Sequence, residues 1–332
     1  MTDRTLEYDS GLLLQDQDDR SMEPKRLLVV VNPYATTVSE KLKSLVVYAL
    51  QARYQVEAVE TRRTGHATEL AAEAARDDFD LVVAFGGDGT LNEVANGLAG
   101  TGTPVTPLPG GSTNVVCQTL GIPLDLIDAA ERLISIADDF VAIPFDLGVA
   151  NGRRFLFASG FGLDAEVVRR ADTKPDLKGT AGKWFYAWSA LSSFYSYCLG
   201  SPPRVEVDTG SETLEGATAI VQNSDPFTYF GDHPIHLCED VDHDDGRLAL
   251  ALLDRFAQRD APSLIPRLLS SSLSVPASRR VRHFSGLERI QATTRATESS
   301  GEDLPLHVDG DCIGYCDRVE WSVEPGALQV VC

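Results

Sequence analysis

The sequence contains no apolar run long enough to cross a bilayer, and its first residues do not follow the basic-then-apolar pattern of a secretion signal. It also lacks an excess of positive charge, since 29 lysines and arginines face 49 aspartates and glutamates, a formal net charge of −20. An acidic surface repels phosphate backbones, so broad nucleic-acid binding is excluded. The same charge disfavours docking on anionic membranes through the whole surface.

The cysteines are not spaced as a metal site. None of the six forms a C-x-x-C pair, and His307 does not complete a zinc pattern with Cys312 and Cys316. Reduced thiols fit a cytoplasmic protein best, and that is the predicted location. The first segment carries five aspartates, so we expect residues 1–24 to form a disordered acidic tail.

Length and periodicity divide the rest of the chain into two parts. With 332 residues, of which 43% are hydrophobic, the chain can bury two cores. Residues 27–140 alternate apolar strand segments, such as Leu27–Val31 and Leu81–Phe85, with helices that have one apolar face. This alternation predicts a doubly wound parallel α/β nucleotide-binding domain at 25–142, with ligands at the carboxyl ends of the strands.

After residue 143 the pattern changes to short strands separated by turns. It predicts a β-sandwich domain at 143–324, which two helices near 180–198 and 261–274 interrupt. Arg154–Ala158 is expected to be one of its strands. Residues 325–332 predict a last strand that returns to the first domain.

The most informative segment runs from Val82 to Val94 and reads V-V-A-F-G-G-D-G-T-L-N-E-V. It predicts a buried strand, a glycine turn carrying Asp88, and a helix capped by Thr90. Glycines let backbone N–H groups approach an anion closely, and the helix N-terminus favours negative charge. The segment therefore predicts a phosphate site with Asp88 beside it. The alternative is a plain strand-to-helix turn in which Asp88 only caps.

Two common nucleotide motifs are absent from this segment. It has no P-loop lysine, and Asn92 stands where a dinucleotide fingerprint has its third glycine. A second glycine turn at Gly110-Gly111-Ser112 follows another strand and offers bare amides and a hydroxyl to phosphate. Its alternative is a helix entry with a Ser or Thr cap.

Near the carboxyl terminus, Val308-Asp309-Gly310-Asp311 predicts a strand followed by a turn with two carboxylates. A carboxylate can take the proton of an acceptor hydroxyl, directly or through one water. Asp-Gly is also a common hairpin turn, which is the alternative interpretation. Asp88 competes with Asp311 for the role of base, because it already stands in the phosphate segment.

Taken in order, these motifs resemble the diacylglycerol kinase catalytic-domain family, and most closely its soluble bacterial lipid kinases, which are relatives of sphingosine and ceramide kinases. The likeness covers roughly residues 25–332. Besides the glycine segments and the Asp311 element, it rests on five further matches: Val30-Val31-Asn32-Pro33, Thr61 with the following Gly65-His66-Ala67, Asp146-Leu147-Gly148, Gly160–Ala165 and Asp244-Asp245-Gly246-Arg247-Leu248.

The resemblance implies a nucleotide-binding domain like that of NAD kinase and phosphofructokinase. It implies transfer of the γ-phosphate of ATP to a lipid hydroxyl between the domains, the lipid being diacylglycerol or a sphingoid relative at the membrane surface. Asp311 would be the base. The ATP site that it implies consists of Asn32, Thr61, Gly86, Gly87, Asp88, Gly89, Thr90, Asn92, Gly111 and Ser112.

The chain departs from the family pattern at two places. The base is usually glutamate, and Asp311 is one methylene shorter. Many bacterial relatives have an Asp-Phe pair where this chain has Val115-Val116, which removes an acidic group near the metal. Because Gly87, Asp88 and Asn114 remain, the site does not resemble a disabled one.

By the same resemblance, Asp242, Asp245 and the Arg247 carbonyl form a structural Mg²⁺ site, while a catalytic Mg²⁺ travels with ATP. Magnesium prefers oxygen ligands and keeps several waters, so two carboxylates and a carbonyl suffice. A solvated acidic turn is the alternative, given the further acids around Asp244.

Two other segments bear on function. Gly160–Ala165 matches a dinucleotide fingerprint superficially, but no acid follows at the ribose spacing, so we expect a close-packed turn facing the cleft. Seven aromatic residues between Trp184 and Tyr197 predict a helix that either belongs to the core or forms a lipid-facing wall, through which the enzyme contacts the membrane transiently.

Other functions stay open at this point. NAD kinase and phosphofructokinase share the Gly-Gly-Asp-Gly-Thr turn, and a catalytically silent nucleotide sensor would account for Asp311 and Val115. The identity of the lipid and the oligomeric state, a homodimer included, are also open.

Overall fold

The computed structural model describes residues 24–35, 38–162, 164–166, 204–231, 233–238, 240–254, 281–295 and 303–332. The predicted acidic tail up to residue 23, the aromatic helix near 180–198 and the helix near 261–274 lie outside the described residues and stay predictions. Within the described part of the chain, no helix has both the length and the apolar character needed to cross a bilayer.

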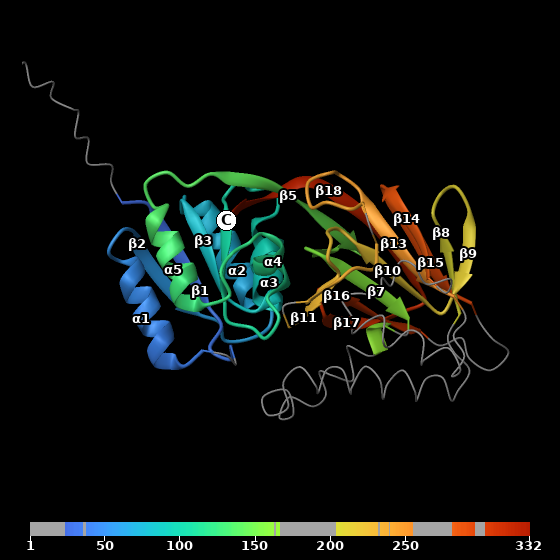
Figure 1. The fold of residues 1–332 in the computed structure, drawn as a ribbon, viewed down its shortest axis with the longest axis horizontal. Coiled ribbons are helices and arrows are strands. Elements are labelled where there is room, and N and C mark those ends of the chain that lie inside the picture. Colours follow the sequence, from blue (N-terminus) through green and yellow to red (C-terminus); the bar gives the residue numbers. More distant parts are fainter. Residues whose placement is uncertain are drawn as a thin grey trace, which may run out of the picture.

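The N-terminal domain is a parallel sheet with strand order β2-β1-β3-β4, flanked by helices (Figure 1). Its strands are β1 (Arg26–Val31), β2 (Gln55–Glu60), β3 (Leu81–Gly86) and β4 (Val105–Pro109). Its helices are α1 (Glu40–Leu50), α2 (His66–Arg76), α3 (Asp88–Leu98), α4 (Val115–Thr119) and α5 (Leu126–Ser135).

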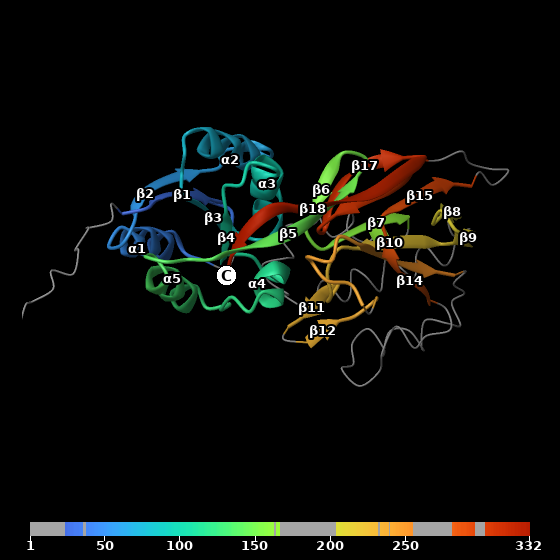
Figure 2. The same cartoon turned by 90° about the horizontal axis from the view of Figure 1, so that it is seen from above.

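Helices cover both faces of this sheet (Figure 2). On one face, alternate strand residues such as Val82 and Ala84 pack against α2 and α3. On the other face, residues such as Val83 and Phe85 pack against α1 and α5. Strands buried on both sides explain the continuous apolar runs of the sequence. The prediction of a doubly wound domain is confirmed.

The C-terminal domain is a sandwich of two sheets. The first eight of its strands are β5 (Ala142–Ala150), β6 (Arg153–Phe155), β7 (Ala158–Gly162), β8 (Val205–Asp208), β9 (Thr213–Gly216), β10 (Thr218–Gln222), β11 (Thr228–Phe230) and β12 (His233–Ile235). The others are β13 (Leu248–Leu253), β14 (Val281–Leu287), β15 (Arg289–Thr294), β16 (Leu304–Val308), β17 (Asp311–Cys316) and β18 (Arg318–Val331).

The two large sheets enclose an apolar core, while β11 and β12 pair with each other as a separate two-stranded sheet. One sheet has the order β14-β13-β10-β7-β16-β17, and the other continues from β18 through β15 and β8 to β9. Phe161 of β7 and Trp321 of β18 meet edge to face, with 6.4 Å between ring centroids. The predicted β-sandwich is confirmed.

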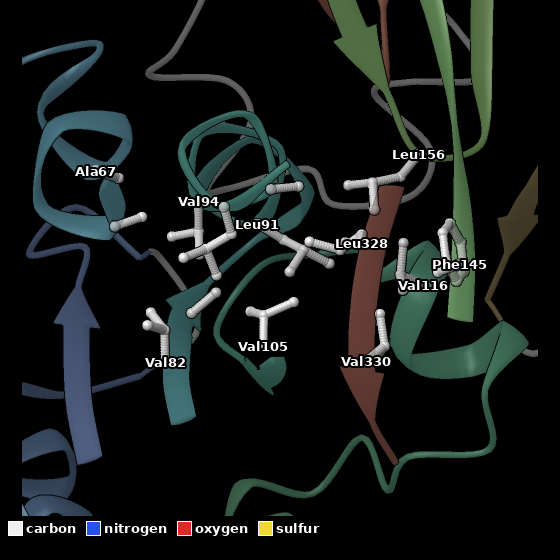
Figure 3. Packing of buried hydrophobic residues seen from close by; sticks show 14 of the residues in the cluster. Ala67, Val82, Leu91, Val94, Val105, Val116, Phe145, Leu156, Leu328 and Val330 are labelled. Atoms are coloured by element: carbon white, nitrogen blue, oxygen red, sulfur yellow. The ribbon is translucent and has the colours of Figure 1, made fainter. Parts of the chain in front are cut away.

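Two long strands join the domains. The sequence predicts a separate last strand at 325–332, but β18 is a single strand from Arg318 to Val331 whose register against β5 shifts between Glu324 and Leu328. Near its end, Val330 pairs with Val105 of β4, so the last residues complete the N-terminal sheet. Leu328 and Val330 pack with Leu91 of α3 in the core between the domains (Figure 3).

The prediction for Gly160–Ala165 is wrong. Residues 158–162 form β7, a central strand whose five residues are all buried, and not a turn. A Cβ at Gly160 would overlap both Asp164 and His307, so the glycine makes room for that pair of side chains. Likewise Arg154–Ala158 is not one strand, because β6 ends at Phe155 and β7 begins at Ala158.

Candidate active site between the glycine loops and the Asp311 hairpin

Four predicted site segments follow the four parallel strands. Asn32 follows β1, Thr61 follows β2, Gly87 follows β3 and Gly110 follows β4. The carboxyl ends of parallel strands meet at one edge of a sheet, so the fold brings these segments together. Backbone bonds hold the first two in place, since the Thr61 N–H donates to the Val31 carbonyl and the Asn32 N–H to the Phe85 carbonyl, both over 2.9 Å.

Helix α3 begins earlier than the sequence predicts. Its N-cap is Gly87 and its first residue is Asp88, so Thr90 lies inside the first turn and does not cap the helix. The Thr90 hydroxyl instead accepts a hydrogen bond of 3.0 Å from the Asn32 side-chain amide. Gly87 has no side chain to cap the helix, and the Thr90 and Leu91 N–H groups donate to the Gly87 carbonyl, so the N–H groups before Thr90 make the α3 N-terminus a candidate anion site.

The glycines of the two loops are explained first by packing of the loops against each other. A Cβ at Gly111 would come within 2.7 Å of the Gly87 Cα, and one at Gly86 would overlap the Thr90 side chain. The contact at Gly111 is with backbone and leaves no room for a side chain, whereas the contact at Gly86 is with the side chain of Thr90. The sequence predicts that the glycines allow close approach of phosphate, and at Gly111 the crossing of the two loops requires glycine by itself.

Asp88 turns toward the second loop. Its carboxylate accepts hydrogen bonds from the backbone N–H groups of Asn114, Val115 and Val116, at the start of α4. Burial raises the pKa of Asp88 to about 7, and the nearby Asp309 adds to the rise, while the three N–H groups oppose it. In this structure Asp88 caps the following helix and ties the two loops together.

The segment after Ser112 is closed by Asn114. Asn114 has a left-handed backbone with φ of 50°, and its side chain both accepts from and donates to the backbone of Gly111. Val115 and Val116, which stand in place of the Asp-Phe pair of many bacterial relatives, are each 2% exposed and belong to the apolar core. Ser112 is exposed at the tip of the loop.

Asp311 reaches this site from the C-terminal domain. The β16–β17 hairpin turns at Asp309 and Gly310, whose φ values are 47° and 82°, as a two-residue hairpin turn requires. Asp311 follows the turn and is exposed. Its Oδ2 lies 2.8 Å from where a Cβ on Gly89 would stand, so its carboxylate touches the first turn of α3.

Asn92 of α3 and Asp309 of the hairpin turn form a second contact between the same two elements, and both side chains are buried. The Asn92 side-chain amide donates to the Asp309 carboxylate over 2.8 Å and to the Arg154 carbonyl over 2.9 Å. Burial raises the pKa of Asp309, and four N–H donors oppose that rise. The family resemblance predicts Asn92 in the ATP site, and the sequence predicts no specific role for Asp309. The Asp-Gly pair predicts the hairpin turn at Asp309, but it does not predict what the Asp309 side chain contacts.

Glu93 is a further residue that the sequence did not single out. Its two carboxylate oxygens accept hydrogen bonds from the Gly65 and Ala67 backbone N–H groups, over 2.8 and 3.2 Å. Glu93 thereby caps α2 and fixes the segment after Thr61 against α3. Because Glu93 lies in the middle of α3, the sequence gives no indication that its side chain caps a different helix.

The predicted metal ligands lie together in one turn. Asp245 accepts the Arg247 N–H over 2.8 Å and the Asp242 N–H over 3.2 Å, so both of its oxygens already hold the turn. Among the described residues, the side chains that converge as ligands are those of Asp242, His243 and Asp244, within 4.8 Å of one another. Buried Asp146 fixes this turn by accepting the Gly246 N–H over 2.6 Å.

Comparison with known proteins now adds to this geometry. Residues 26–142 match the diacylglycerol kinase catalytic domain, and residues 158–332 match the YegS C-terminal NAD kinase beta sandwich-like domain. The chain belongs to the diacylglycerol kinase family. The resemblance drawn from the motifs is therefore confirmed, with the fold that it implied.

Individual relatives agree with the family assignment. A diacylglycerol kinase of Staphylococcus epidermidis is 33% identical over 86% of this chain and 86% of its own length. A diacylglycerol kinase of Bacillus subtilis is 35% identical over 58% of this chain, and the match spans 62% of that relative's length. A crystal structure of a diacylglycerol kinase from Bacillus anthracis, 20% identical, shares the fold with a TM-score of 0.66 over 93% of this chain and 97% of its own.

Proposed function

We propose that this protein is an ATP-dependent lipid kinase that transfers the γ-phosphate of ATP to a lipid hydroxyl. The observation that carries the proposal is the contact between the exposed Asp311 carboxylate and Gly89, in the first turn of α3. It supports the proposal because a carboxylate of one domain lies against the first turn of the helix that carries the predicted phosphate site of the other. The names of the relatives support diacylglycerol as the acceptor, and the resemblance drawn from the motifs leaves a sphingoid lipid as the alternative.

The residues present fit ATP with Mg²⁺. The first turn of α3 and the exposed Ser112 hydroxyl offer donors to the phosphates, and Asn32 and Thr61 lie at the ends of the neighbouring strands. Bound ATP supplies the phosphoryl group, and its Mg²⁺ neutralises charge on the phosphates. Asp242 and its neighbours could hold a second, structural ion.

In this proposal Asp311 is the base and Asp88 is a positioning residue. Asp311 takes the proton of the lipid hydroxyl as that oxygen attacks the γ-phosphorus and the bond to the β-phosphate breaks. Phosphoryl transfer proceeds through a loose transition state, so alignment and charge neutralisation matter more than the strength of the base. Asp88 holds the start of α4, and with it the second glycine loop, against α3.

The test is a transfer assay with γ-labelled ATP. The purified chain is incubated with MgATP and a total lipid extract, and the labelled product is identified by mass spectrometry. Parallel reactions replace the lipid with NAD or with fructose 6-phosphate. Labelled lipid is the expected result. Label in NAD or in the sugar phosphate alone would overturn the proposal, and ATP binding without transfer to any acceptor would favour a silent nucleotide sensor.

A further inference from the structure

Asp309 is the most heavily hydrogen-bonded carboxylate at the contact between the domains. It is 5% exposed, and its Oδ1 accepts the N–H groups of Phe157 and Ala158 over 3.0 and 3.2 Å. Its Oδ2 accepts the Leu156 N–H over 2.7 Å and the Asn92 side-chain amide over 2.8 Å. One side chain thus joins the link between β6 and β7 to the phosphate-side helix α3.

The Asn92 end of this connection is itself held in place. The Arg153 guanidinium donates to the Asn92 side-chain oxygen over 2.6 Å, so that side chain is bonded at both ends. Its amide nitrogen also reaches the Arg154 carbonyl. Since Asn92 is 1% exposed, it is not available to phosphate in this arrangement. Its place in the glycine motif is explained by its contact with the other domain.

Asp309 stands two residues before the proposed base. Its own backbone N–H donates to the Ala158 carbonyl over 2.7 Å, and residues 309 and 310 form the turn of the hairpin. The tip of the hairpin is therefore fixed through both the backbone and the side chain of Asp309. The direction in which Asp311 leaves the turn follows from that attachment.

We propose that Asp309 is a positioning residue, which holds the Asp311 carboxylate over the first turn of α3 by bonding Asn92 and the β6–β7 link at once. This inference rests on the proposed function. Misplacing a reacting group by about 1 Å can cost roughly 100-fold in rate. Loosening Asp309 is therefore expected to slow transfer without weakening the hold on ATP.

Three variants test this proposal, and Asn96 provides the matched control. Asn96 lies one turn after Asn92 on α3, and its side chain also donates to the Arg154 carbonyl, over 3.2 Å. It donates as well to the Asn92 side-chain oxygen, over 3.2 Å, but Arg153 holds that oxygen independently, and within the described residues the Asn96 side chain makes no bond to Asp309. Asp309→Asn leaves two of the four donors facing an amide nitrogen, which cannot accept. Asn92→Ala removes one donor to Asp309, and Asn96→Ala removes a similar contact between the domains without touching the hairpin.

We expect kcat to fall about 100-fold in Asp309→Asn and about tenfold in Asn92→Ala, with the KM for ATP changed by no more than about twofold. Asn96→Ala is expected to keep its kcat even if its melting temperature falls. If Asn96→Ala loses as much kcat as Asn92→Ala, or if a folded Asp309→Asn keeps full kcat, the proposal is overturned. If Asp309→Asn does not fold, the comparison of kcat between Asn92→Ala and Asn96→Ala tests the proposal.

A second measurement does not depend on turnover. Hydrogen–deuterium exchange of the peptide spanning 308–312 should speed up in Asp309→Asn and Asn92→Ala and stay unchanged in Asn96→Ala. Unchanged exchange in all three variants would overturn the positioning role. If the wild-type chain transfers phosphate to no lipid, the proposed function fails, while this measurement still reports whether Asp309 holds the hairpin.

Discussion

Asp88 of the first glycine loop and Asp311 of the β16–β17 hairpin are both carboxylates near the candidate site, and their surroundings differ. Asp88 lies inside the motif that predicts a phosphate site, yet its oxygens accept the backbone N–H groups at the start of α4. Asp311 lies in what reads as an ordinary turn, yet it is exposed and touches Gly89. A motif can locate a site without telling which acid faces the substrate.

The glycines of the two regions differ in the same way. Gly111 is required because the Gly87 backbone occupies the space of a side chain. Gly310 has open space around it and is favoured only by its φ of 82°. Gly89 belongs to neither class, because the atom nearest to its absent Cβ is the flexible end of Asp311. A substitution at Gly89 can therefore disturb the chemistry while the fold adapts.

The largest effect is expected for the carboxylate that faces the site. Asp311→Asn should lower kcat by about 10²- to 10⁴-fold, the usual contribution of a positioned general base. ATP affinity, measured by titration calorimetry, should stay within about twofold, because Asp311 holds no phosphate. A kcat close to that of the wild type would give the role of base to Asp88 and reverse the comparison.

Gly89→Ala should lower kcat by about 100-fold with little loss of stability. The added methyl carbon would lie 2.8 Å from the Asp311 Oδ2, so it pushes that carboxylate away. Alanine also suits a helical position better than glycine does. Melting temperature and kcat are measured together. The double variant with Asp311→Asn is the control, since Gly89→Ala should cost almost nothing further once the carboxylate is gone. Additive losses would show that Gly89 acts elsewhere.

Asp88→Asn should change how stability depends on pH. The pKa of Asp88 is about 7 in the folded chain against an ordinary 3.8, so between these values the folded state keeps a proton that the unfolded state has released. The contribution of Asp88 to the free energy of unfolding therefore falls as the pH rises from about 4 to 7. The variant lacks this contribution, because asparagine does not titrate.

Urea unfolding of both proteins at pH 4, 5, 6, 7 and 8 measures that difference. The free energy of unfolding of the wild type, relative to Asp88→Asn, should be highest near pH 4 and decrease to a plateau above about pH 7. A difference that does not vary with pH, or that grows with pH, would mean that Asp88 is ionised without penalty in the folded chain.

The smallest effect is expected at the exposed tip of the second loop. Ser112→Ala should raise the KM for ATP about twofold to tenfold, which corresponds to the loss of one hydrogen bond of about 0.5–1.5 kcal/mol. The melting temperature should not change. Ser44→Ala on α1, also exposed and far along the chain from the loops, is the matched control. Equal KM values for both variants would remove Ser112 from the ATP site.

Much of the fold could be predicted because the sequence repeats a pattern that only one architecture satisfies. Continuous apolar runs such as Leu27–Val31 fit strands buried on both faces. Errors arose where the pattern was too short to decide. Two glycines in β7, Gly160 and Gly162, favoured the prediction of a turn. The Pro-Gly pair in β18 favoured a break, and only the pairing with β5 shows that the strand is continuous.

The sequence by itself determined the two-domain fold, the family and the edge of the sheet where the glycine loops gather, since periodicity and local motifs are encoded by neighbouring residues. Only the tertiary structure decided that Asp311 meets Gly89, that Asp88 caps α4, and that Asn92 bonds Asp309. The physical reason is that these partners lie up to 222 residues apart in the chain and meet because long strands hold the two domains in one register, which no local pattern records.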